Sequence, residues 1–112
     1  MTLWDARCAR YQRDDVTVQM GGLASNLSRI AWFAQRADRA GALPIFQESK
    51  YFTEWAAPAC SLEQQSLLAE LQWRLAMWER SWGSKMAPSQ IAQEASAWSA
   101  QLLEQAGCLA RW

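Results

Sequence analysis

The stretch VTVQMGGLASNLSRIAWFAQRADRA, residues 16–40, decides the fold of this chain. Its apolar residues recur at alternating spacings of four and three, at Val16, Met20, Leu23, Leu27, Ile30, Ala34 and Ala37. This spacing places them on one stripe of an α-helix. Asp14 and Asp15 lie where an N-cap and a favourable first-turn charge belong, and Gly41 fits a left-handed terminator. We predict a helix over residues 15–40, which either continues through Gly21-Gly22, with or without a kink, or begins after them.

Two further helices are indicated by the residues at their N-termini. Pro44 fits the first position of a helix, where its missing N–H costs nothing, and predicts a helix over residues 44–57. Ser61 and Gln64 have the spacing of a capping box, in which each side chain satisfies a free backbone N–H of the other residue. They predict a helix over residues 62–82.

The remaining elements complete an all-α domain. A fourth helix is predicted over residues 88–106, and residues 1–14 form a short N-terminal extension. Short connections make neighbouring helices antiparallel, so residues 1–112 are predicted to be a single helical domain, an antiparallel up-down four-helix bundle. The predicted core consists of Leu27, Ile30, Phe52, Leu71, Leu75, Trp78, Trp98 and Leu102.

The composition argues against catalysis. The chain of 112 residues has eight Trp and no His, so it lacks the usual general base near neutral pH and the commonest metal ligand. Eleven acidic residues balance eleven basic ones, which gives no overall attraction to nucleic acid. We therefore predict a protein that is not an enzyme, holds no metal or cofactor, and binds no nucleic acid.

The cysteines and the hydropathy indicate a cellular location. Cys8, Cys60 and Cys108 are far apart and odd in number, which favours a reducing compartment over a disulfide framework. No run approaches the ~20 apolar residues of a membrane span, and the N-terminal residues show no secretory pattern. We expect a cytoplasmic protein without a membrane span.

The predicted helix 62–82 is apolar on two sides. Opposite its core stripe lies a second line that includes Leu62, Ala69 and Trp73, with Met77 beside it. One interpretation is that this helix is central in its own bundle and touches several helices. The other is that Trp73 and Met77 contact a partner, most simply a second copy in a homodimer.

Trp32 lies on the polar side of its helix, near Arg36 and Arg39. Trp32 and Arg36 are one turn apart and could stack as a cation–π pair. An exposed Trp surrounded by Arg is typical of an interface hot spot. The alternative is that the N-terminal segment folds over Trp32 and covers it.

Four segments resemble a family of small all-helical cyanobacterial proteins. They are GLASNLSRIAWFAQ, FQESKYFTEWAAP, LAELQWRLAMWERSW and ASAWSAQLLEQAG, and the likeness extends over about residues 20–107. The resemblance implies a cytoplasmic bacterial helical protein and adds no activity.

We predict a non-catalytic interaction or adaptor protein, acting as a homodimer through Trp and Arg contact surfaces. Its predicted contact residues are Trp32, Arg36, Arg39, Trp73 and Met77. The alternative is a bundle that binds an apolar small ligand or pigment between its helices. That function requires an apolar cavity, which we expect to be lined by Trp78, Trp82 and Trp98.

Overall fold

The protein is all-α. The computed structural model describes residues 2–107, and within this range it contains five α-helices and no strand. The elements in chain order are α1 (Leu3–Arg13), α2 (Val16–Gln35), α3 (Arg39–Ala56), a short 3₁₀ helix (Ala57–Ala59), α4 (Leu62–Ser81) and α5 (Pro88–Gln105).

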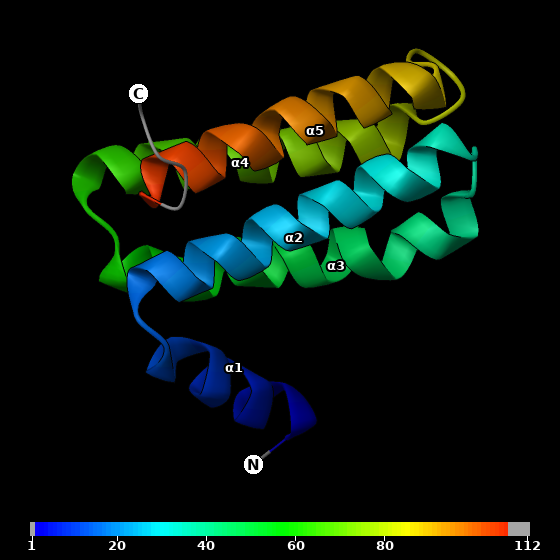
Figure 1. Ribbon diagram of the computed structural model, residues 1–112. Helices are drawn as coiled ribbons and strands as arrows, with labels where there is room; N and C mark the ends of the chain where they lie inside the picture. Colours follow the sequence, from blue (N-terminus) through cyan, green and yellow to red (C-terminus); the bar gives the residue numbers. More distant parts are fainter. Residues whose placement is uncertain (1, 108–112) are drawn as a thin grey trace.

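Four long helices surround the core, and α1 lies outside them (Figure 1). The helix α2 packs against both α3 and α5, and α3 also packs against α4. Each of these helices runs in the direction opposite to the one before it (Figure 1). The helix α1 packs against α3, on the side away from α4 and α5.

The helix α2 begins at Val16, one residue after the predicted start, with Asp15 as its N-cap. The Asp15 side chain accepts a hydrogen bond from the Val18 N–H, as an N-cap does. The helix continues through Gly21 and Gly22 without a break. Its predicted stripe faces the core, with five members buried: Met20, Leu23, Leu27, Ile30 and Ala34.

The end of α2 was predicted wrongly. The helix stops at Gln35 and not at residue 40, and the last member of the predicted stripe, Ala37, lies beyond it and is exposed. Ala37 has φ 53°, the left-handed conformation expected of a terminating Gly. Its N–H donates to Ala34 O (3.0 Å) and the Asp38 N–H donates to Phe33 O (2.9 Å), which is a Schellman ending.

The start of α3 was also predicted wrongly, because the chain reverses at Ala37 and not at Gly41. The helix begins at Arg39, because the Asp38 side chain caps it by accepting from the Gly41 N–H. Gly41 is therefore inside the first turn, where a Cβ atom would lie 2.4 Å from the Phe33 ring. Pro44 does not start the helix but lies within it, where it cannot donate a backbone hydrogen bond.

The two predicted helices nearer the C-terminus agree with the structure to within one residue. The capping box of Ser61 and Gln64 is present at the start of α4, and Pro88 begins α5. Gly83, after α4, and Gly107, after α5, have positive φ angles of 73° and 74°. These glycines therefore lie where left-handed termination requires them.

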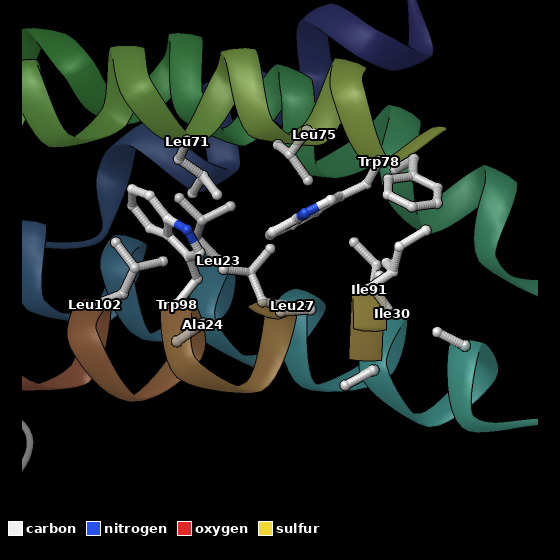
Figure 2. Packing of buried hydrophobic residues seen from close by; sticks show 14 of the residues in the cluster. Leu23, Ala24, Leu27, Ile30, Leu71, Leu75, Trp78, Ile91, Trp98 and Leu102 are labelled. Atoms are coloured by element: carbon white, nitrogen blue, oxygen red, sulfur yellow. The ribbon is translucent and has the colours of Figure 1, made fainter. Parts of the chain in front are cut away.

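The core is built from two kinds of helix contact. Between α2 and α5, the Ser99 hydroxyl donates to the carbonyl of Ala24 (2.8 Å) and lies 2.9 Å from the Ser28 hydroxyl. Larger side chains fill the space toward α4, where Leu71, Leu75 and Trp78 point to residues of α2 and α5 (Figure 2). Seven of the eight predicted core residues are buried. The exception, Phe52, is half-buried and stacks on Tyr11 of α1.

Candidate interaction surfaces

The tryptophans of α2 and α4 differ widely in exposure. Trp32 is 51% exposed and Trp73 is 60% exposed, whereas Trp78 has no accessible surface. A large exposed aromatic side chain offers apolar contact area at little cost in side-chain entropy. Trp32 and Trp73 are therefore the centres of two candidate surfaces.

The first surface is at the C-terminal end of α2. The Arg36 guanidinium lies over the Trp32 ring, 3.6 Å from its centroid, and its Nη1 donates to the Trp32 carbonyl (2.9 Å). Phe33 meets the edge of the same ring at a centroid distance of 5.1 Å. The stacked pair is present as the sequence predicts. The alternative, that the N-terminal segment covers Trp32, is wrong, because that segment packs against α3 and leaves Trp32 exposed.

The second surface is the outer face of α4, defined by Leu62, Ala69, Trp73, Ala76, Met77 and Arg80. Leu62 is 82% exposed, Met77 is half-buried, and the other four are exposed. Trp73, Met77 and Arg80 help to line a hollow of about 300 Å³. The inner face of the same helix carries the buried residues Leu68, Leu71, Leu75 and Trp78. The apolar line opposite the core stripe is thus on the surface, and the interpretation that the helix is covered on both sides within one chain is wrong.

The structure does not bring all predicted contact residues together. Arg36 joins Trp32, and Met77 joins Trp73. Arg39 instead belongs to the first turn of α3 and donates to the carbonyl of Glu79 in α4 (3.4 Å). The helices α2 and α4 both pack against α3 and against α5. They therefore lie diagonally opposite each other across the core. The two surfaces are therefore separate.

The residues predicted to line a ligand cavity are part of the packing. Trp78 is fully buried and its indole N–H donates to Glu94 Oε1 (3.0 Å). Trp98 is also buried, and both rings lie among leucine and isoleucine side chains (Figure 2). Trp82 meets Phe46 edge-on at a centroid distance of 6.2 Å. Five surface hollows of residues 2–107 are lined by other side chains.

A third contact region, between α1 and α3, was missed by the sequence analysis. Trp4 stacks on Tyr51 with a centroid distance of 4.5 Å, and Tyr11 stacks on Phe52 at 4.3 Å. Trp55 contacts both Trp4 and Tyr11 at tilted angles. The signal was available, because Trp4 and Tyr11 are seven residues apart and share one side of a helix. The predicted N-terminal extension thus contains a helix, α1 (Leu3–Arg13), that packs against the rest of the chain.

Polar groups strengthen this third contact. The Arg7 guanidinium pairs with one carboxylate oxygen of Glu48, and Asn26 of α2 donates to the other (3.0 Å). The Tyr11 hydroxyl donates to the carbonyl of Gln19 (2.6 Å), and burial raises the pKa of Tyr11 above its usual value.

Burial also raises the pKa of the free thiol of Cys60. Cys8 is also a free thiol and is half-buried, and Cys108 lies outside the described residues.

Residues 2–107 contain no group of three or more Cys, Asp and Glu side chains placed to hold a metal ion. No helix in this range is long and apolar enough to cross a membrane.

A comparison of the chain with protein families, curated proteins and solved structures finds no match. The resemblance to cyanobacterial helical proteins therefore rests on the quoted segments alone.

Proposed function

We propose that the protein is a non-catalytic interaction protein of the cytoplasm that forms a homodimer through the outer face of α4. The exposure of Trp73 carries this proposal. Trp, Met and Arg are enriched in the cores of protein interfaces, and the outer face of α4 presents one of each in Trp73, Met77 and Arg80.

The scaffold that we propose is an antiparallel up-down four-helix bundle formed by α2, α3, α4 and α5. Its support is the alternation of helix directions in Figure 1 and the packing of α2 against α3 and α5. A helix of such a bundle normally has one apolar side and one wetted side. Packing within one chain requires only the inner side of α4 to be apolar, but its outer face is apolar as well.

The charges along α4 favour a second copy as the partner. Glu63 and Glu70 lie before Trp73 in the helix, and Arg80 lies after it, and all three are exposed. Two α4 helices that cross antiparallel at Trp73 place each Arg80 between Glu63 and Glu70 of the other copy, about 4.5 Å from Glu63 and about 6 Å from Glu70 along the axis. A parallel arrangement instead places like charges side by side. The self-complementary pattern is that of a twofold interface.

The alternative function, binding of an apolar small ligand, has weaker support. It requires space beside Trp78, Trp82 and Trp98, and Trp78 and Trp98 are packed among core side chains. A ligand of that kind displaces well-packed apolar groups, which costs free energy.

The test is a measurement of molar mass by light scattering on the wild type and on Trp73→Glu. We expect a wild-type dimer and a Trp73→Glu monomer. In protein dilute enough for the wild type to be monomeric, both should unfold at the same denaturant concentration, because Glu at this exposed position disturbs only the interface. Trp32→Glu, at the other exposed tryptophan, is the matched control and should remain a dimer. A wild-type monomer, or a dimer that Trp73→Glu leaves intact, contradicts the proposal.

The charge pattern has its own test. Arg80→Glu should weaken dimerisation because it faces two carboxylates of the other copy. Combining Arg80→Glu with Glu70→Arg should restore part of the affinity, measured by dilution of the dimer. Equal affinity of the single and double variants argues against the antiparallel arrangement.

A further inference from the structure

The helix α1 is held by a small number of side-chain contacts. None of its residues is fully buried. An isolated helix of 11 residues is marginal in water, so α1 depends on docking for its stability. Elements of this kind belong to the part of a protein that opens most readily.

The docking site is specific for α1. An aromatic strip on α3, formed by Tyr51, Phe52 and Trp55, receives Trp4 and Tyr11. Between these two rings, Arg7 pairs with Glu48. Removing α1 would expose the strip and leave the Glu48 carboxylate without its cation. The structure thus identifies the chemistry of the occupant, which is a helix with aromatic residues seven positions apart and an Arg between them.

The connection between α1 and α2 can act as a hinge. Asp14 (φ −72°, ψ 153°) and Asp15 (φ −70°, ψ 168°) have helical φ angles and extended ψ angles. Residues 3–20 contain neither Gly nor Pro. Rotation of these two ψ angles alone would join α1 and α2 into one continuous helix and carry α1 away from its own α3.

We propose that α1 is an exchangeable arm, which docks either on α3 of its own chain or on α3 of a second copy. A second copy offers an identical strip and an identical Glu48, so exchange repeats every docking contact between the chains. The freedom lost on association opposes it, as does the loss of two hydrogen bonds at the bend, from the Val18 N–H to Asp15 Oδ1 (3.0 Å) and from Gln19 Nε2 to the Asp14 carbonyl (2.7 Å). The backbone hydrogen bonds of a continuous helix at the hinge offset part of that cost. The surface through which the arms would be exchanged lies on α1 and α3, so it is separate from the outer face of α4.

The test uses a charge exchange in full-length chains that also carry Trp73→Glu, which removes the proposed α4 interface. Arg7→Glu places two carboxylates together within its own chain, and Glu48→Arg places two guanidiniums together. In a mixed dimer with exchanged arms, both docking sites again hold opposite charges. We expect native mass spectrometry of the equimolar mixture to show the heterodimer as its main dimer, increasing with protein concentration.

The chain with both substitutions, Arg7→Glu and Glu48→Arg, is the control, because it restores the ion pair within one chain and should match its Trp73→Glu parent. A mixture with no heterodimer, or with a heterodimer no more abundant than the homodimers, overturns the proposal. This result does not depend on the α4 dimer. Failure of that dimer shows itself separately, as a wild type whose mass Trp73→Glu does not change.

A second pair of variants keeps the test decisive if Glu48→Arg does not fold. In the same Trp73→Glu chain, Asp14→Ala with Asp15→Ala favours a helical hinge. Asp15→Pro keeps the observed φ at position 15 and the extended conformation of Asp14, and so holds the arm closed. We expect a larger dimer fraction for the alanine variant than for the proline variant. Equal fractions overturn the proposal.

Discussion

Trp78 and Trp73 are the same residue type on the same helix, yet the first has no accessible surface and the second is 60% exposed. They are five residues apart, which separates them by about 140° around the helix axis. Trp78 donates its indole N–H to Glu94 between α4 and α5, whereas the ring of Trp73 is exposed, with the guanidinium of Arg74 5.4 Å from its centroid. The helical phase of a residue, and not its chemistry alone, therefore decides whether it stabilises the protomer or is available to a partner.

The largest effect that this comparison predicts is on the free energy of unfolding. Trp78→Ala should lower it by about 3–5 kcal/mol, because a fully buried indole leaves a cavity that the neighbours cannot fill. Trp73→Ala should change it by no more than about 0.5 kcal/mol. Urea denaturation of dilute protein, where the protomer alone is measured, gives both values. Similar losses for the two variants would show that exposure does not separate their roles.

An intermediate effect is expected where Ser99 of α5 meets the backbone of Ala24 in α2. Ser99→Leu should cost about 1–3 kcal/mol of stability, because the added methyl groups must push α5 away from Ala24. Ser96→Leu, one turn away on the exposed side of α5, is the control and should be nearly neutral. Thermal unfolding monitored by circular dichroism compares the two. An equally large loss of stability in Ser96→Leu would show that the cost comes from placing Leu in α5 and not from the contact with Ala24.

The smallest effect is expected at the exposed tryptophan of α2. Arg36→Ala should cost about 0.5–1 kcal/mol, the usual contribution of an exposed cation–π pair. The change is measured by urea denaturation, with Arg29→Ala on the same helix as a reference. An unchanged stability would mean that the ring and the guanidinium adopt the stacked position without gaining from it.

Periodicity predicted most of the fold, because burial of an apolar stripe is what holds these helices in place. The residues Leu27, Leu71 and Leu102 are buried as their spacing indicates. The reversal between α2 and α3 was predicted too late in the chain, because Ala37 takes the left-handed conformation that the sequence assigns to Gly41. Gly41 is instead required by the closeness of the Phe33 ring, a tertiary contact that no local pattern reveals.

The candidate surfaces were predicted only in part, because helical phase locates the side of a helix that faces away from the core but not the segments that pack on that side. Helical phase indicated that Trp32 and Trp73 lie away from the core stripes, and both are exposed. It could not indicate whether another segment covers them, since that depends on where the N-terminal residues pack. Those residues contact α3 through Trp4 and Tyr11, and this docking follows from shape and ring contacts between distant segments.

The stacking of Trp4 on Tyr51, with Trp55 close by, gives the molecule a built-in optical probe. Neighbouring aromatic rings held at fixed angles couple their electronic transitions and produce a strong near-ultraviolet circular dichroism signal. When α1 leaves its strip, the coupling of Trp4 with Tyr51 and Trp55 disappears while the helical far-ultraviolet signal persists. Release of the N-terminal helix from an aromatic strip can therefore be followed in unlabelled wild-type protein.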